Sequence, residues 1–234
     1  MQARAGAVPP QRDTPDLRMQ IIQVCVFLVD AGFVIGTWGN VGVRIEEGLI
    51  VTPSRIDFRK MEPDDLVVVD WEGKKISGHR LPSSEMHLHR LILLNRPDLG
   101  ASVHTHSPYA SAVACAGRSI PVLAEDVAQI IGGEIGCSRY VPAGRHRALA
   151  EAAWEAMGSE SAAVLLANHG AVACGRDLDE ALLAAQVLEK AAMAYVMASA
   201  VGGCTVIPDI LVREERHRFL YKYGREEDVS GQGT

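Results

Sequence analysis

The sequence predicts an α/β fold in which one sheet lies between helical layers in a single domain. Three observations support this: short β-rich segments alternate with helical patterns, turn residues join several strands as hairpins, and 48% of the 234 residues are hydrophobic, enough for one sizeable core. We expect the domain to span residues 14–225, with a loose N-terminal tail at 1–13 and a C-terminal tail at 226–234.

The first predicted helix begins at Thr14-Pro15-Asp16. These residues supply an N-cap, a proline at the first helical position and an acid in the first turn. The helix should end near Ala31, because Gly32 stands where a left-handed C-terminal cap belongs.

The middle of the chain predicts a β-hairpin, a second strand pair and a helix. In order, these are "NVGVRI" and "GLIVTP" joined by a turn at 46–48, a strand at 66–70, a turn at 72–74 with a short partner strand, and a helix that opens at 82–84 and runs to about Asn95.

The second half of the chain predicts two helices, a strand pair and a long helix, after the strand of "ASVHTH". In order, these are a helix at 107–116, an irregular Gly-rich stretch, a helix at 145–157, two strands of "AAVLLANHGAVACG" around a tight turn at 168–170, and a helix ending near Ala200. Asp177 and Glu180 predict a capping box at the start of that last helix.

Composition excludes several classes of protein. A net charge of −6 argues against a nucleic-acid footprint. The five cysteines are odd in number, scattered and never in C-x-x-C spacing, so we expect neither a disulfide framework nor a thiolate metal site. We therefore expect the protein in a reducing cytoplasm. No continuous apolar stretch approaches the roughly 20 residues of a membrane span, so we expect no transmembrane segment or secretion signal.

Three histidines predict a metal site. His104 and His106 share one face of a strand, and His169 follows the apolar strand 163–167 between Asn and Gly. Three neutral imidazoles with an open position are typical of a catalytic zinc site. A hydrogen-bonded interior or surface imidazole is the ordinary alternative for each one alone. His87 and His89 have the same spacing on a helix, where they diverge by about 200°, so they are not assigned jointly to a metal.

Two further features accompany the histidines. Glu85, in the first turn of the helix after Ser83 and Ser84, is the carboxylate placed to move protons; complementing the helix dipole is its alternative role. The two serines and the helix N-terminus also predict an anion site, to which the turns at 39–40 and 52–54 could add donors. Ordinary turn chemistry is the alternative for each segment.

Five motifs, "GNVGVR", "LIVTPSR", "LPSSE", "VHTHSPYA" and "LLANHG", resemble in order and separation the class II aldolase/adducin family, most closely its L-fuculose-phosphate aldolase branch. The match runs from about Asp16 to Gly224. The resemblance implies a central, largely antiparallel sheet between helical layers. It also implies a homotetramer with active sites between neighbouring subunits.

The resemblance assigns a role to each site residue. His104, His106 and His169 become ligands of Zn²⁺, with Mn²⁺ or Co²⁺ able to take the same ligands, and Glu85 becomes the acid/base that also approaches the metal. Asn40, Ser54, Ser83 and Ser84, with backbone amides around Gly39 and Arg55, become the phosphate site of a small phosphorylated sugar. Tyr223, in the C-terminal "YKYGRE", becomes a proton donor that acts across the subunit interface.

Three positions depart from the fuculose-phosphate branch. Arg55 stands where that branch has glycine, Gly42 where it has serine, and Glu125 where it has a tyrosine near the substrate. Arg55 could grip an anion with its guanidinium or be a solvated turn residue. Glu125 could accept hydrogen bonds from sugar hydroxyls or move a proton. These departures bear on the aldehyde fragment of the substrate.

The implied reaction is zinc-dependent cleavage of a ketose 1-phosphate, including a deoxy- or methylthio-pentulose 1-phosphate, to dihydroxyacetone phosphate and a short aldehyde. Alternatives within the family are a pentulose-phosphate 4-epimerase, a methylthioribulose-phosphate dehydratase and a decarboxylase of a phosphorylated keto acid. A non-catalytic scaffold similar to the adducin head would predict loss of the metal ligands, yet all three histidines are present.

Overall fold

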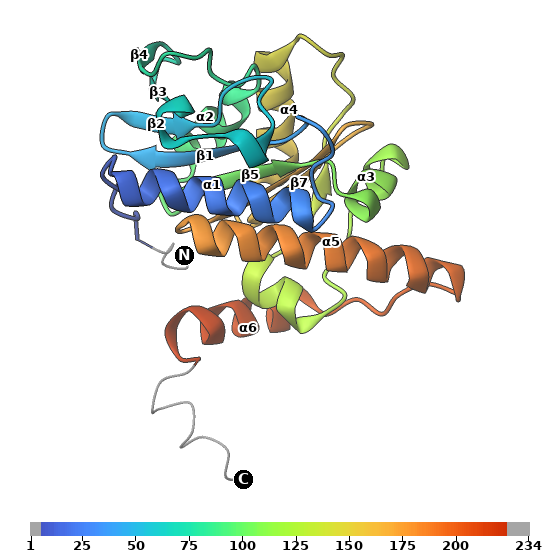
Figure 1. The fold of residues 1–234 in the computed structure, drawn as a ribbon. Helices are drawn as coiled ribbons and strands as arrows, with labels where there is room; N and C mark the ends of the chain where they lie inside the picture. The colour runs from blue at the N-terminus through green and yellow to red at the C-terminus, as the bar shows by residue number, and fades with distance from the viewer. Residues whose placement is uncertain (1–5, 224–234) are drawn as a thin grey trace.

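The computed structural model describes residues 6–223 and has an eight-stranded sheet at its centre (Figure 1). The strands are β1 (Asn40–Ile45), β2 (Gly48–Val51), β3 (Val67–Asp70), β4 (Lys75–Ser77), β5 (Ala101–Thr105), β6 (Gly136–Cys137), β7 (Ala163–Leu166) and β8 (Gly170–Gly175). Their order across the sheet is β4-β3-β2-β1-β5-β8-β7-β6. Every pairing is antiparallel except that of β6 with β7, so the predicted largely antiparallel sheet is confirmed.

Helices cover both faces of this sheet. They are α1 (Pro15–Asp30), α2 (Met86–Asn95), α3 (Pro108–Cys115), α4 (His146–Met157), α5 (Leu178–Ala200) and α6 (Asp209–Tyr221), with short turns of 3-10 helix at Phe58–Lys60 and Pro63–Asp65. The buried side chains of α2 and α4 belong to one hydrophobic cluster, and those of α1, α3 and α5 belong to another. In Figure 1, α6 lies beyond α5, on the side away from the sheet.

The two clusters follow from strand alternation. Along β2, Leu49 and Val51 face the α2 and α4 layer, whereas Ile50 between them faces the α1 and α5 layer. Both faces of the sheet are therefore buried, which explains why β2 (GLIV), β3 (VVVD) and β7 (AVLL) are nearly continuous runs of β-branched and aliphatic residues.

Most of the predicted elements are present in the structure. They could be predicted because the residues that mark the ends of an element lie close to it in the sequence. Thr14 Oγ1 accepts the hydrogen bond of Leu17 N at 3.2 Å, as an N-cap should. The capping box predicted at α5 forms only by half. Asp177 accepts from Glu180 N at 2.9 Å, but the Glu180 carboxylate turns to the backbone N–H and guanidinium of Arg176.

Five elements were not predicted from the sequence. They are the two turns of 3-10 helix, α6, β6 and a stretch of π-helix at Val127–Ile131. The sequence of α6, "DILVREERHRFLY", buries only Val212 among its residues, so it lacks the apolar periodicity that marks a helix.

The helix α5 is long and apolar enough to cross a membrane by length and composition alone, which differs from the expectation that no segment approaches this length. In the fold, α5 packs against β8 and α3, and 39% of its most apolar window is buried inside the protein. A core helix passes the same test of length and composition. Its buried carboxylate, Glu189, is bonded to the start of α3.

The segment expected as a loose N-terminal tail makes backbone contacts where it is described. Val8 N donates to Pro97 O at 2.9 Å, and Gln11 forms a parallel bridge with Ile45. Residues 1–5 and the predicted C-terminal tail at 226–234 lie outside the described residues.

Candidate active site

Three imidazoles meet at one end of the sheet. His104 is in β5, His106 follows its last residue, and His169 lies in the turn between β7 and β8. Pairing of β5 with β8 brings that turn beside the histidines, because Thr105 is opposite Ala171 in the register. One ring nitrogen from each lies within 4.8 Å of the others, and the Nε2 atoms of His104 and His106 are 3.1 Å apart.

The tautomer of His104 favours a metal ligand. Its Nδ1 donates a hydrogen bond to Ala171 O at 2.9 Å, so the proton resides on Nδ1 and the Nε2 lone pair faces the other imidazoles. Burial, and then the nearby His104, lower the pKa of His106 to about 3 and also lower the pKa of His169. Neutral imidazoles are the form that binds a metal ion.

Close packing at Gly170 brings the histidines together. A Cβ atom at this position would lie 2.3 Å from the carbonyl oxygen of Thr105 and 3.3 Å from Cε1 of His104. Only glycine lets β8 approach β5 so closely at this point. The turn before it contains Asn168 in the left-handed region, with φ of 57°, a conformation that asparagine adopts more readily than most residues.

The carboxylate of Glu85 faces the imidazoles. Its Oε2 lies 3.4 Å from Nε2 of His104, and its Oε1 lies 3.3 Å from Nε2 of His169. Burial raises the pKa of Glu85, but His104, His169 and a hydrogen bond from Asn40 together outweigh burial and lower this pKa to about 2. Glu85 is therefore an ionised carboxylate beside three nitrogen donors.

Glu85 is the N-cap of α2, whereas the sequence predicted it in the first turn. Its backbone has φ of −98° and ψ of 14°, outside the helical region, and its N–H donates to Ser83 Oγ at 3.2 Å. The side chain makes no capping hydrogen bond to the helix. The carboxylate is thus directed toward the histidines instead of the orphan N–H groups of α2.

These residues fit a metal ion. Three imidazole nitrogens and one carboxylate converge, and hydrogen bonding directs the free lone pair of His104 to their centre. This donor set suits Zn²⁺ and other divalent transition metals.

The serines predicted at the phosphate site lie together in two adjoining loops. Ser54 Oγ donates to Pro82 O at 2.9 Å and accepts from Ser84 N at 3.1 Å. Ser83 is buried and Ser84 is exposed. The loops also join through a bridge between Pro53 and Pro82. Hydroxyl and N–H groups are therefore gathered next to the start of α2.

The other residues expected near phosphate differ in their surroundings. Gly39 and Asn40 lead into β1, and both ends of the Asn40 carboxamide are engaged, with His89 and with Glu85. Arg55 is exposed beside Ser54 and has φ of 58°, the left-handed region that favours glycine.

The two remaining expected residues, Glu125 and Tyr223, lie in different surroundings. Glu125 is exposed next to Asp126, which pairs with Lys190 of α5. Tyr223 is 58% exposed just past the end of α6, and its ring lies 5.8 Å from that of Phe219.

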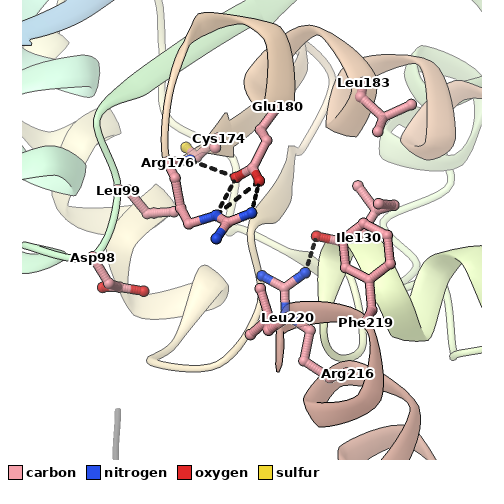
Figure 2. Close-up of a pocket in the computed structure, with 11 residues that line it drawn as sticks. Asp98, Leu99, Ile130, Cys174, Arg176, Glu180, Leu183, Arg216, Phe219 and Leu220 are labelled. Atoms are coloured by element: carbon pink, nitrogen blue, oxygen red, sulfur yellow. Dashed lines mark hydrogen bonds and ion pairs between the residues drawn. The ribbon is translucent and has the colours of Figure 1, made fainter. Parts of the chain in front are cut away.

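The cavity in Figure 2 locates the end of α6, the helix that Tyr223 follows. Phe219 and Leu220 of α6 line this cavity together with Leu99, which precedes β5, and Arg176, which follows β8. The histidines are at the other end of these strands, and the four residue steps along β5 span roughly 13 Å. Tyr223 therefore belongs to the opposite end of the sheet.

Sequence reasoning missed three residues that organise the site. His89 and Ser102 are hydrogen-bonded behind Asn40. Glu189 accepts hydrogen bonds from Ser107 Oγ and from the N–H groups of Tyr109 and Ala110, which holds the start of α3 directly after His106. No local pattern in the sequence indicates such a contact between residues about 80 positions apart.

Comparisons with known proteins agree with this fold. Residues 19–196 match the model of the class II aldolase and adducin N-terminal domain. The 5-methylthioribulose-1-phosphate/5-deoxyribulose-1-phosphate aldolase of Rhodospirillum rubrum is 38% identical, covering 88% of this chain and 90% of the relative. The 5-deoxy-D-ribulose 1-phosphate aldolase of Bacillus thuringiensis serovar kurstaki is 34% identical, covering 82% and 90%.

A solved L-fuculose 1-phosphate aldolase superposes with a TM-score of 0.85 at 32% identity, covering 90% of this chain and 99% of that one. The chain belongs to the class II aldolase and adducin family.

Proposed function

We propose that this chain is a zinc-dependent aldolase that cleaves a ketose 1-phosphate to dihydroxyacetone phosphate and a short aldehyde. The observation that carries the proposal is the convergence of three imidazoles with the Glu85 carboxylate, 3.3 to 3.4 Å from two of them. The aldolases named among the relatives support the reaction class.

His104, His106 and His169 would hold the metal ion. When bound, the ion supplies Lewis-acid stabilisation of the negative charge that develops as a carbon–carbon bond breaks. We propose Zn²⁺ because three neutral imidazoles with an open position are its usual catalytic ligands, although Mn²⁺ and Co²⁺ accept the same donors.

Glu85 would move the proton of the reaction. In the cleavage direction the ionised Glu85 carboxylate would accept the proton of the C4 hydroxyl, the C3–C4 bond would break as C4 becomes the aldehyde carbonyl, and Glu85 would then return this proton to C3 of the three-carbon fragment. Asn40 Nδ2 donates to Oε2 at 2.9 Å, so Oε1 is the atom available to carry the proton. A positioned carboxylate of this kind contributes typically about 10²- to 10⁴-fold to the rate.

The serine loops would bind the substrate phosphate. Ser54, Ser83 and Ser84 contribute hydroxyl groups, backbone N–H groups near Gly39 and Arg55 contribute further donors, and α2 presents its positive end. The bond between Ser54 Oγ and Ser84 N would be exchanged for bonds to phosphate oxygens.

A pentulose 1-phosphate with an apolar substituent at C5, a deoxy or methylthio sugar, is the substrate class we propose. The substrates in the names of two relatives support it. Trp38 supports it independently, since its ring is stacked near His106 at 6.4 Å between centroids and its side chain is 66% exposed beside the site.

The active unit we propose is a homotetramer in which Tyr223 acts on the site of a neighbouring copy. The position of Tyr223 at the far end of the sheet supports action between chains. Exposed apolar side chains supply surface for such contacts, among them Met197, Val201, Ile210 and Leu211.

Free thiols on all five cysteines support a reducing, cytoplasmic compartment for the protein.

A product screen by mass spectrometry tests the proposed reaction. Purified protein with Zn²⁺ is incubated with 5-deoxyribulose 1-phosphate, 5-methylthioribulose 1-phosphate and L-fuculose 1-phosphate, and dihydroxyacetone phosphate is the expected product. The His106→Ala variant is the control and should form none. A 4-epimerase would leave the mass unchanged, a dehydratase would lose water and a decarboxylase would lose carbon dioxide. Any of these results, or no turnover at all, would overturn the proposed cleavage.

A further inference from the structure

A fully buried histidine lies directly behind the candidate acid/base. His89 is in α2, four residues after Glu85, so both side chains are on one side of the start of this helix. Its Nε2 is 2.5 Å from Asn40 Oδ1, and its Nδ1 is 2.7 Å from Ser102 Oγ. Asn40 Nδ2 in turn lies 2.9 Å from Glu85 Oε2. Four side chains from α2, β1 and β5 thus form one continuous hydrogen-bonded row.

The fold leaves space for this row at Gly42. A Cβ atom on Gly42 would lie 2.7 Å from both Cβ and Cγ of His89, closer than real Cβ atoms come. The absence of a side chain at this position of β1 therefore lets the imidazole approach Asn40. Position 42, where the fuculose-phosphate branch has serine and this chain has glycine, is therefore a position where the His89 ring leaves no room for a side chain.

The direction of each hydrogen bond follows from the orientation of the Asn40 carboxamide. Its Nδ2 donates to Glu85 Oε2, and its Oδ1 faces Nε2 of His89. His89 must then donate from Nε2. A neutral imidazole has one N–H, so Nδ1 accepts and the Ser102 hydroxyl donates.

Burial supports the neutral form of His89. Desolvation, followed by the influence of His104, lowers the pKa of His89 to about 3, although Glu85 opposes this change. At neutral pH the imidazole therefore carries a single N–H, and a single direction of the row satisfies every polar atom in it.

We propose that His89 and Ser102 are positioning residues that lock the Asn40 carboxamide in the orientation that donates to Oε2 of Glu85. This inference rests on the proposed role of Glu85 in proton transfer. One carboxylate oxygen is held by the row, and Oε1 is left to carry the proton. If Asn40 turned over, its oxygen would face the carboxylate, and repulsion would displace Glu85 from the histidines.

The first test is independent of activity. Proton–nitrogen correlation spectra of the full-length protein, labelled with ¹⁵N-histidine and loaded with Zn²⁺, report the tautomer of His89, with the His89→Gln variant identifying its signals. The expected result is a proton on Nε2 at pH 7. A proton on Nδ1, or an imidazolium, would overturn the proposed direction of the row.

The second test separates positioning from packing. His89→Leu should keep zinc content and lower kcat at least tenfold with KM changed less than about threefold, because the phosphate and metal contacts are untouched. His89→Gln can place an amide N–H near the Nε2 position and should recover much of kcat. His87→Gln is the matched control: it changes the other histidine of the same helix, and kcat should not change.

The outcomes distinguish the two proposals. Wild type that cleaves no ketose 1-phosphate contradicts the proposed function, and the tautomer then still decides the direction of the row. Folded, zinc-loaded His89→Leu with wild-type kcat contradicts the positioning role.

If His89→Leu does not fold, the Ser102→Ala variant takes its place. A lower kcat with retained thermal stability supports the positioning role. An unchanged kcat with an unchanged His89 tautomer overturns it.

Discussion

At the scale of single residues, the chemistry depends on where Glu85 points. The side chain is held between two imidazoles and the Asn40 amide, and these groups outweigh burial in keeping its pKa low. The pair His104 and His106 could be predicted because alternation along a strand is a local rule. The partners of Glu85 could not, because Asn40 and His89 meet only when β1 and α2 pack together.

The substitution Glu85→Gln tests this placement. The amide preserves shape but cannot exchange a proton, so kcat should fall by about 10²- to 10⁴-fold while the metal is retained. The measurement is cleavage rate together with exchange of the dihydroxyacetone phosphate C–H proton with solvent. Exchange at the wild-type rate in this variant would exclude Glu85 as the proton carrier.

Arg55 gives a second prediction at this scale. Its φ of 58° is costly for a residue with a side chain, by roughly 1 to 2 kcal/mol, but glycine costs about 0.5 to 1 kcal/mol through the unfolded chain. Arg55→Gly should therefore raise the free energy of unfolding by between about 0 and about 1.5 kcal/mol. If the guanidinium helps bind phosphate, KM for the ketose 1-phosphate should rise several-fold, and an unchanged KM would make Arg55 a turn residue only.

At the scale of elements, the site is made by the pairing of β5 with β8. Helix starts were predictable because caps such as Thr14 and Asp177 act within three residues. The proximity of His169 to His104 was not available from any local signal, since it depends on a register between strands about 65 residues apart. The helix α6 was missed because its sequence is highly charged and only Val212 of it is buried.

The substitution Gly170→Ala tests whether the close pairing of β5 with β8 assembles the metal site. The added Cβ would meet Thr105 O at 2.3 Å, so β8 must shift away from β5, and His169 shifts with it. We expect the variant to lose most bound zinc, whereas wild type should hold close to one ion per chain. Elemental analysis of purified protein measures this. Ala171→Gly, one residue along the same strand, is the control for lost strand stability without the collision, and equal zinc in all three proteins would refute the packing argument.

At the scale of the whole molecule, the histidines and Tyr223, which we propose act in one site, lie at opposite ends of the sheet of one chain. The histidines gather where β5 ends, and Tyr223 follows an α6 that packs near the start of β5. The family resemblance, more than any pattern in "YKYG", predicted that tyrosine as a site residue. Its physical placement is consistent with that role only if a second copy receives it.

Mixed tetramers test this arrangement. His106→Ala and Tyr223→Phe chains should each be nearly inactive alone, since one loses a metal ligand and the other the proton donor. After unfolding, mixing at equal amounts and refolding, a site is intact when its histidines come from a Tyr223→Phe chain and its tyrosine from a His106→Ala neighbour. If each copy serves one neighbour, random assembly makes about a quarter of the sites intact, so activity should return to roughly a quarter of wild type.

Native mass spectrometry verifies that hybrid tetramers have formed, and wild type taken through the same refolding sets the reference activity. Verified hybrids with no recovered activity would mean that Tyr223 does not act between chains.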